Sequence, residues 1–404
     1  MFVLSISLNQ KVFPYLYEIF FLQFLMETLN LSYWEKTSFY NSDVIIIGSG
    51  IVGLNAAITI KKQQPNVSVT ILERGFLPAG ASTKNAGFAC FGSLSELIEQ
   101  EKSGTIALQE LIGKRWKGLQ KLRSLVGDSR LDFQINGGFE LFKPTQSALS
   151  EECVSKIGHF NDIIQDITNE KTAFSIANSR IETFGFEGID CLIENKLEAQ
   201  LNPGQMIKAL TELAISLRVT ILNSCTVHRF EESDTSLLVS TSQGEFKCKK
   251  LLFCTNAFAS QLLPQLDLKP GRGQVLITKP IENLKLKGTF HYDKGYYYFR
   301  NVGDRVLLGG GRNLDFFTEE THQFGETPLV QNTLIRLLKE VILPNTAFEI
   351  DQKWSGIMAF GPELSPIIKE VSTNVFCAVR CNGMGIAIGS QTVEEAGEMV
   401  LKSI

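Results

Sequence analysis

Two residue types that often carry hydrolytic or metal chemistry are scarce or unpaired in this chain. The four histidines are isolated, and none stands beside a serine or cysteine in a hydrolase motif. The eight cysteines are scattered without a C-x-x-C pair. This spacing argues against a zinc site and a small disulfide scaffold, and fits free thiols in a reducing compartment. We therefore expect a cytoplasmic protein without a metal site.

An excess of charge of one sign is also missing. The net charge is only -4 over 404 residues and no basic stripe occurs, so nucleic acid is not an expected partner. No long repeat or low-complexity linker interrupts the chain. With 44% hydrophobic residues, a chain of this length can bury a large core and is expected to form two or three domains.

The chain has no long uninterrupted hydrophobic run. Its most apolar stretch, residues 12–26, is broken by a proline, a glutamate and a glutamine, and is too short for a confident membrane span. No signal-cleavage pattern follows it, so a secretory leader is not indicated. Residues 1–30 are either an interfacial membrane anchor or an extension upstream of a functional start near Met26, and we favour the extension.

The chain does contain a strand, a glycine-rich turn and a helix in immediate succession. Consecutive aliphatic residues in DVIIIGSG (43–50) are typical of a parallel strand covered on both faces. Apolar residues then recur at helical spacing from Ile51 to Lys62. Residues 65–75 alternate as in a second strand. Together these segments predict one βαβ unit.

Three glycines at the turn, Gly48, Gly50 and Gly53, form a G-x-G-x-x-G pattern that predicts a dinucleotide site. Such glycines let backbone N–H groups approach a pyrophosphate at the positive end of a helix. Glu73 follows about twenty residues later, where a carboxylate can bind ribose hydroxyls. Its charge disfavours a ribose 2′-phosphate, although Arg74 stands beside it. The predicted contacts of this half of the cofactor are Gly48, Ser49, Gly50, Ile51, Val52, Gly53, Glu73 and Arg74.

Two further segments favour FAD over NAD. The loop GASTKNAGF (80–88) has the small, hydroxyl-rich composition of a loop packed against a flat cofactor. NGMGIAIGS (382–390) opens the last helix, and its backbone N–H groups can stabilise negative charge on a reduced flavin. An NAD enzyme has no evident need of that second glycine loop. The predicted flavin contacts are Ser82, Thr83, Lys84, Asn85, Ala86, Gly87, Gly383, Met384, Gly385 and Ile386.

The rest of the chain alternates helical and strand patterns. Glycine-loop-to-helix units near both ends favour two interleaved domains over two in tandem. The sequence predicts a helical region over 94–125, a hairpin over 133–142 with a turn at 136–137, a polar helix-prone region over 145–200, three strands between 219 and 254, and strands at 274–278, 296–300 and 305–309.

These motifs together resemble the D-amino-acid oxidase superfamily of FAD enzymes, nearest its glycine oxidase and γ-glutamylputrescine oxidoreductase branch. The resemblance rests on VIIIGSGIVGLNAAI, ILERG, GASTKNAG, LLFCTNAFA, RGQVL, YYYFR, LLGGGR, WSGI and GMGIAIGS, in that order. It covers nearly the whole chain from about Leu31. The first glycine motif is shared by many flavoproteins, whereas the ordered set is more specific.

The resemblance implies an α/β fold in which a Rossmann-like FAD-binding domain is interleaved with an α+β substrate domain. The antiparallel sheet of the substrate domain would lie over the flavin. The FAD-binding domain would comprise 31–130, 196–265 and 351–404, and the substrate domain 131–195 and 266–350.

The resemblance also implies individual cofactor contacts. The backbone of Val227 would contact the adenine, and Thr255, at the end of the LLFCTNAFA strand, is placed with the cofactor-binding residues. Covalent branches of the family attach the flavin through a specific His or Cys. The 80–88 loop has no histidine, and Cys90 lies just beyond it, so we expect non-covalent FAD.

On the substrate side, residues 295–312 predict a hairpin. Tyr296 and Tyr298 share one strand face, and the resemblance selects Tyr296, four residues before Arg300, as a substrate contact. Simple packing of the sheet is the alternative for both tyrosines. Arg312 follows three glycines and can hold a carboxylate through two hydrogen bonds, unless it belongs only to a surface turn.

Met358 in WSGIMAF departs from the family pattern. In the amino-acid oxidases that the chain resembles, this position carries an arginine that clamps the substrate α-carboxylate, and methionine cannot pair with a carboxylate. Either Arg312, Arg300 or Arg380 replaces it, or the substrate has no α-carboxylate there. Simple glycine or D-alanine oxidation is therefore disfavoured. Arg380 is alternatively expected near the flavin.

The leading hypothesis is an FAD-dependent oxidoreductase that transfers a hydride from an amine or amino acid to flavin N5, giving an imine that hydrolyses. This step needs positioning more than a strong protein base, so no general base is assigned. The electron acceptor would be oxygen or a quinone. Two alternatives stay open: a 2-hydroxy-acid or polyol-phosphate dehydrogenase on the same fold, and a non-catalytic flavoprotein subunit. The substrate-pocket candidates are Tyr296, Tyr298, Arg312, Met358 and Arg380.

Overall fold

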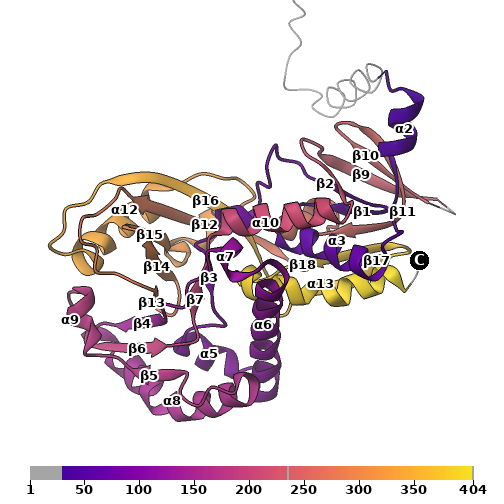
Figure 1. Ribbon diagram of the computed structural model, residues 1–404. Helices are drawn as coiled ribbons and strands as arrows, with labels where there is room; N and C mark the ends of the chain where they lie inside the picture. Colours follow the sequence, from indigo (N-terminus) through magenta and orange to yellow (C-terminus); the bar gives the residue numbers. More distant parts are fainter. Residues whose placement is uncertain (1–29, 234–235, 403–404) are drawn as a thin grey trace, which may run out of the picture.

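The computed structural model describes residues 30–233 and 236–402, which fold around two large β-sheets (Figure 1). The expectations for the N-terminal extension concern residues that lie outside this range, apart from Asn30. One sheet is mainly parallel and the other mainly antiparallel. The predicted fold class, a Rossmann-like part interleaved with a part built on an antiparallel sheet, is confirmed.

The first sheet has a parallel centre. Its strand order is β17-β18-β11-β1-β2-β8, and β10 and β9 continue it from β11. β1 pairs in parallel with both β2 and β11, which confirms the predicted βαβ unit. The strands are β1 (Asn41–Ile47), β2 (Val69–Leu72), β8 (Thr220–Leu222), β9 (Val227–Glu232), β10 (Leu237–Thr241), β11 (Gly244–Phe253), β17 (Ile367–Ser372) and β18 (Val375–Val379).

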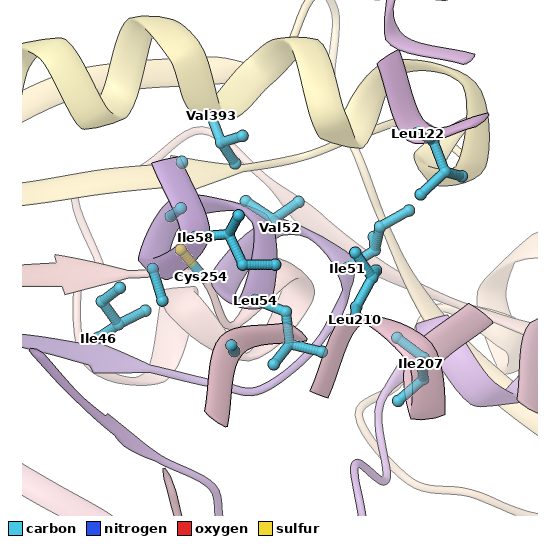
Figure 2. Packing of buried hydrophobic residues seen from close by; sticks show 14 of the residues in the cluster. Ile46, Ile51, Val52, Leu54, Ile58, Leu122, Ile207, Leu210, Cys254 and Val393 are labelled. Carbon is cyan, nitrogen blue, oxygen red and sulfur yellow. The ribbon is translucent and has the colours of Figure 1, made fainter. Parts of the chain in front are cut away.

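Three helices pack on this sheet or on one another: α3 (Ile51–Gln63), α10 (Pro203–Ser216) and α13 (Gly385–Leu401). α3 is buried on all sides from Ile51 to Lys61, because it contacts both α13 and α10. A helix enclosed in this way needs apolar residues all round rather than on one stripe. Figure 2 shows its side chains gathered with Val393 of α13 and Leu210 of α10.

The second sheet has the order β16-β12-β15-β14-β13-β4-β6-β5. All its pairs are antiparallel except β4 with β13. Aromatic side chains fill its core; Phe290 stacks on Phe299 with ring centroids 4.7 Å apart. The strands are β4 (Gly138–Phe142), β5 (Phe174–Ile176), β6 (Cys191–Asn195), β12 (Lys269–Thr278), β13 (Thr289–Tyr292), β14 (Tyr297–Val302), β15 (Arg305–Gly310) and β16 (Ile350–Phe360).

The other elements cover or join the sheets. Helices α5, α6 and α8 contact one another, and α6 also contacts α13, whose direction it crosses in Figure 1. These elements are α2 (Tyr33–Phe39), α4 (Ala81–Lys84), β3 (Phe88–Ala89), α5 (Leu94–Glu101), α6 (Thr105–Val126), α7 (Asp128–Leu131), α8 (Ser147–Thr168), α9 (Arg180–Phe184), β7 (Ala199–Gln200), α11 (Phe316–Glu319), α12 (Pro328–Leu337), a π-helical turn (Leu338–Ile342) and 3-10 turns at Pro144–Gln146, Asn256–Gln261 and Arg312–Leu314.

The hairpin expected over residues 133–142 is wrong. Gln134 forms a bridge with Gln200, whereas Gly138 pairs with Asn195 in β6. The chain does turn at Gly137, which has a φ of +79°. The turn leads the chain from its bridge with Gln200 to its pairing with β6, and no hairpin forms. Turn residues determine where a chain changes direction, but not which strand it then pairs with.

The helical region predicted over 94–125 consists of two helices, separated at Gly104, whose φ of +116° is incompatible with a helix. Two other regions contain more elements than predicted. The 145–200 region holds strands β5, β6 and β7 besides α8 and α9. Four strands, not three, lie between 219 and 254, because β9 and β10 form a hairpin of their own.

The structure also differs from the predicted boundary at residue 351, between the substrate domain and the last segment of the FAD-binding domain. β16 pairs with β12 along its length, from Ile350 to Phe360, and so belongs to the second sheet. The chain returns to the first sheet only at β17. The change of sheet predicted at residue 351 therefore occurs after Phe360; the division into domains otherwise stays a prediction.

Candidate active site

A cavity of about 830 Å³ lies at the carboxyl ends of β1, β2, β11 and β18 and extends against β12, β14 and β16. Small-molecule and cofactor sites in proteins are roughly 300–1,000 Å³. The carboxyl end of a parallel sheet is also where ligands of such folds bind. Both sheets thus contribute to one site.

The glycine turn between β1 and α3 opens into this cavity through Gly48 and Gly50. Gly48 has a φ of +99°, which favours glycine. Gly53 does not line the cavity; a Cβ there would lie 1.9 Å from the carbonyl oxygen of Gly48. Gly53 therefore lets α3 approach the turn closely, and Ile51 and Val52 at the start of α3 do reach the cavity.

Glu73 lies at the end of β2, is 8% exposed and lines the cavity together with Arg74. Its carboxylate accepts hydrogen bonds from the backbone N–H and hydroxyl of Ser49, at 3.0 and 2.9 Å, and from the N–H of Gly75 at 2.9 Å. Ser49 itself does not line the cavity and instead holds Glu73 in place. A carboxylate has about four acceptor positions, so Glu73 keeps one for a ribose hydroxyl.

The loop predicted to face the flavin contains the short helix α4. The hydroxyl of Ser82 accepts the N–H of Ile51 at 2.9 Å, which joins this loop to the start of α3. Trp354 of β16 donates through Nε1 to the carbonyl of Lys84 at 3.0 Å. Ser82, Lys84, Asn85, Ala86 and Gly87 line the cavity, whereas Thr83 turns away and donates to the carbonyl of Pro78.

The C-terminal glycine loop closes another side of the cavity. Gly383 has a φ of +80°, and Met384 is the N-cap of α13. Gly383, Met384, Gly385 and Ile386 all line the cavity, so the N-terminal end of this 17-residue helix points at it. The partial positive charge of a helix N-terminus stabilises an anion placed there.

The two cofactor contacts expected from the family pattern also line the cavity. Val227 begins β9, and Thr255 follows β11. The hydroxyl of Thr255 and the side-chain oxygen of the neighbouring Asn256 are buried without a hydrogen-bond partner among the described residues. Unsatisfied buried polar atoms beside a cavity are those that a bound ligand satisfies.

These features fit FAD. The glycine turn and α3 would hold the pyrophosphate, Glu73 the ribose, and Val227 the adenine. Loop 80–87 and the start of α13 would hold the flavin, with Thr255 between the two halves. Of the predicted contacts, the structure gathers all around one cavity except Ser49, Gly53 and Thr83, which support their neighbours.

The substrate candidates Tyr296, Tyr298, Arg312 and Met358 line the same cavity. Tyr297, between these two tyrosines, packs into the core of the second sheet. Burial raises the pKa of Tyr298 to about 12, so its hydroxyl stays neutral. Tyr296 is 40% exposed and stands at the opening.

Arg312 is half-buried between two aromatic rings. Its Cζ lies 4.0 Å from the ring centre of Phe360 and 4.8 Å from that of Phe316. Burial lowers the pKa of its guanidinium. Within the described part of the chain it makes no hydrogen bond and no ion pair, so its donors are available to a ligand.

Arg300 and Arg380 do not line the cavity, so their predicted roles as a substituted clamp are not supported. Arg300 donates to the carbonyls of Ala86 at 2.5 Å and Leu201 at 3.0 Å. Arg380 donates to the carbonyls of Asp267 and Ser365, both at 3.0 Å. Arg380 also lies 3.4 Å from a carboxylate oxygen of Glu363. Both guanidiniums thus bond mainly to backbone carbonyls away from the cavity, which no sequence motif indicates.

A group of buried polar residues beside the substrate candidates was not predicted. His291 of β13 lines the cavity, and its Nε2 lies 2.7 Å from Oε1 of Glu198. Burial opposes protonation of His291, but Glu198, Glu96 and Glu140 outweigh it and raise its pKa to about 9. The same part of the cavity is lined by Cys90, Glu96 and Arg115. We call these residues, together with His291 and Glu198, the polar wall.

In the polar wall, three residues come close enough together to ligate a metal ion, although their positions in the sequence do not suggest it. Ligand atoms of Cys90, Glu198 and His291 lie within 4.8 Å of one another. These residues are far apart in the chain, and nothing in their local sequence connects them. The His291–Glu198 hydrogen bond accounts for the arrangement without an ion, and the expectation of no metal stays a prediction.

Comparison with known proteins agrees with this site. The family model described as "DAO: FAD dependent oxidoreductase" matches residues 43–395. The bifunctional protein ThiO/ThiG of Trichormus variabilis is 24% identical over 337 residues, or 81% of this chain and 47% of that protein. A D-amino acid dehydrogenase of Vibrio atlanticus is 22% identical over 385 residues, which cover 81% of this chain and 88% of that protein. The chain thus spans about half the length of ThiO/ThiG.

Solved structures share the fold. L-proline dehydrogenase from P. horikoshii superposes with a TM-score of 0.70 and 17% identity, covering 90% of this chain and 94% of that one. Glycine oxidase from Bacillus cereus superposes with a TM-score of 0.67 and 17% identity, covering 90% and 96%. Among the described residues, no helix has both the length and the apolarity needed to cross a bilayer.

The family match extends over most of the chain and coincides with the cavity that fits FAD. The resemblance inferred from the motifs, the FAD cofactor and the enzymatic character are therefore confirmed. The chain belongs to the DAO family of FAD-dependent oxidoreductases.

Proposed function

We propose that this enzyme oxidises the C–N bond of an amine or amino acid that carries a carboxylate. The observation that carries this proposal is Arg312, a half-buried guanidinium that lines the cavity and makes no hydrogen bond or ion pair with any described residue. A guanidinium matches a carboxylate through two parallel hydrogen bonds. The names of relatives, among them a D-amino acid dehydrogenase and a sarcosine oxidase subunit, point to the same substrate class.

The chain's own residues would position the substrate. When bound, FAD accepts a hydride at flavin N5. Arg312 would hold the carboxylate, and its two flanking rings, Phe316 and Phe360, would exclude water from that pair. Tyr298, whose pKa burial raises further above neutrality, can donate one hydrogen bond from its hydroxyl. Fixing the reacting carbon in this way supplies much of the rate gain in such transfers.

Met358 supports a clamp at Arg312. A Cβ on Gly273 would lie 2.8 Å from its Cε, and a Cβ on Gly383 would lie 3.8 Å from its sulfur. Met358 thus forms an apolar wall between β12 and the C-terminal loop. A carboxylate against this wall would lose its hydration without gaining a partner, so the carboxylate belongs at Arg312.

The test is an anaerobic screen of the holoenzyme with amines, amino acids and 2-hydroxy acids, followed by flavin absorbance. We expect bleaching by amines or amino acids that bear a carboxylate. Bleaching by hydroxy acids alone would instead establish the dehydrogenase alternative. Repeating the screen in air and with a soluble quinone identifies the electron acceptor, which we propose to be oxygen or a quinone.

Arg312→Met tests the clamp. Loss of charge-assisted hydrogen bonds worth about 1.5–3 kcal/mol should lower kcat/KM for the active substrate roughly 10- to 100-fold. Arg336→Met, which removes an exposed charge from α12, is the matched control and should leave kcat/KM unchanged. Equal effects of the two substitutions would contradict a clamp at Arg312.

A further inference from the structure

Arg115 of α6 is a buried guanidinium whose donors are only partly used. It is 2% exposed, and its Nη1 donates to the carbonyl of Phe91 at 2.7 Å and to the side chain of Gln100 at 3.0 Å. Its Nε is buried without a hydrogen-bond partner. Nη2 also makes no hydrogen bond, and no carboxylate lies within 4.0 Å, among residues 30–233 and 236–402.

This arrangement is unfavourable unless something else completes it. A buried guanidinium loses its hydration, and here only Nη1 regains hydrogen bonds, to Phe91 and Gln100. Buried charges are normally paired because this loss is costly. The free atoms, Nε and Nη2, form one edge of the guanidinium. That edge presents two parallel N–H groups, the geometry that binds both oxygens of a carboxylate.

Arg115 faces the cavity already described. We define the Arg115 lobe as the part of the cavity lined by Cys90, Glu96, Gln100, Arg115, His291 and Lys294. Its lining residues come from α5, α6, β13 and the segments beside β3 and before β14.

The acids around the Arg115 lobe already have partners. Glu198 is bonded to His291, and Glu96 accepts the N–H of Ser93 at 2.9 Å and lies 3.9 Å from Nδ1 of His291. Glu140 is held by the hydroxyls of Ser93 and Ser95 and by the N–H of Ser95.

The positively charged side chains of the Arg115 lobe have fewer partners than its acids. Within the described residues, neither Arg115 nor Lys294 has an ion-pair partner. Lys294 is exposed and keeps its hydration, whereas Arg115 is buried. The charge of Glu96 acts on Arg115 without a hydrogen bond, so the free edge of the guanidinium has no hydrogen-bonded anion.

We propose that the Arg115 lobe binds a second, distal carboxylate of the substrate, so that the enzyme acts on amines or amino acids with two carboxylates. Arg312 holds one and Arg115 the other, with the reacting C–N bond between them. The inference deepens the proposed function and rests on it only for the reaction at that bond. It makes Arg115 a specificity-determining residue.

Carboxylates that bind but are not oxidised test the Arg115 lobe without catalytic turnover. The oxidised holoenzyme is titrated with malonate, succinate, glutarate and adipate, and with the monocarboxylates of matching length, while flavin absorbance is followed. We expect at least one dicarboxylate to bind ten times more tightly than its monocarboxylate partner. The inference is wrong if no dicarboxylate shows a preference, and this outcome depends on no variant.

Arg115→Met should abolish the preference, and Arg115→Lys, which keeps the charge but loses the two-pronged edge, should retain only part of it. Lys117→Met removes an exposed charge from the same helix and should leave the preference intact. A preference that survives in Arg115→Met overturns the inference.

Flavin properties separate a substrate role from a cofactor role. If Arg115→Met shifts the flavin midpoint potential or ligand-free spectrum but not the dicarboxylate preference, Arg115 serves the flavin and the inference is wrong. If no amine reduces the flavin but dicarboxylates still bind tightly through Arg115, the proposed reaction fails while the lobe stands. The two ideas can therefore fail independently.

Discussion

Single side chains in this enzyme have roles that their chain neighbours do not indicate. His291 and Glu198 lie 93 positions apart in the chain and form a buried pair at 2.7 Å. Arg300 and Arg312 stand on the same hairpin, yet one bonds to backbone carbonyls and the other faces the cavity. Which donors remain free is decided by the groups that surround each side chain.

The His291–Glu198 pair predicts a pH dependence of stability. The folded pKa of His291 is raised from 6.5 to about 9. Its contribution, about 3 kcal/mol from the size of that shift, is therefore complete below pH 6.5 and is lost as pH rises through 9. Urea unfolding of the holoenzyme at several pH values should show this decline in the wild type.

His291→Gln should remove most of that decline. His159→Gln, at an exposed histidine, is the matched control and should preserve it. A wild-type free energy of unfolding that stays constant between pH 6.5 and 9 would show that the pair does not hold the extra proton.

At the scale of elements, close packing between α3 and the glycine turn decides whether the cofactor site forms. A Cβ on Gly53 would lie 1.9 Å from the carbonyl oxygen of Gly48, and backbone there cannot move without displacing β1 or α3. The turn and the helix therefore act as one unit.

Gly53→Ala should lower the free energy of unfolding by about 1–3 kcal/mol, the usual effect of overpacking, and reduce the FAD content of the purified protein. Gly113→Ala on α6 is a matched control, because a Cβ there meets nothing within 4 Å. Alanine at that position should stabilise the helix by roughly 0.5–1 kcal/mol. Normal FAD content in Gly53→Ala would contradict the role assigned to this contact.

At the scale of the whole molecule, the two sheets are tied together at the cavity. Arg300 of β14 donates to Ala86 and Leu201, and Trp354 of β16 donates to Lys84. All three hydrogen bonds start in the second sheet. Those to Ala86 and Lys84 reach loop 80–87, which lines the cavity, and the third reaches Leu201 before α10. They hold the substrate wall and the flavin loop at a fixed distance.

Arg300→Met should leave two carbonyls without donors and destabilise the protein by about 1–3 kcal/mol. The dissociation constant for FAD, measured by fluorescence, should rise because loop 80–87 is loosened. Arg305→Met, on the same hairpin, removes a partly exposed ion pair with Asp351 and one hydrogen bond to the carbonyl of Thr278. None of these three residues lines the cavity, so this control should leave the FAD affinity unchanged. Unchanged FAD affinity in Arg300→Met would contradict this coupling.

The mode of FAD attachment is another property of the assembled site. We expect the yellow colour to leave the protein on acid precipitation, because the flavin is held by non-covalent contacts alone. Colour that remains in the precipitate would instead show a covalent bond to a cavity residue.

Much of this architecture follows from local sequence. The βαβ unit, the hairpin of β14 and β15 and the final helix were all predicted, because hydrophobic periodicity and glycine spacing are local signals. The same signals identified most of the predicted FAD contacts that line the cavity. The hairpin expected over 133–142 failed because its partners, Gln200 and Asn195, lie some sixty residues away in the chain.

The sequence alone determined the cofactor, since an FAD site is built from glycine turns and helix starts whose conformations are set by adjacent residues. It also identified Met358 as a departure from the family clamp. It did not distinguish Arg312 from Arg300 and Arg380, and it did not point to Arg115. Those distinctions depend on which guanidinium is bonded to backbone carbonyls and which faces the cavity, and long-range packing sets that outcome.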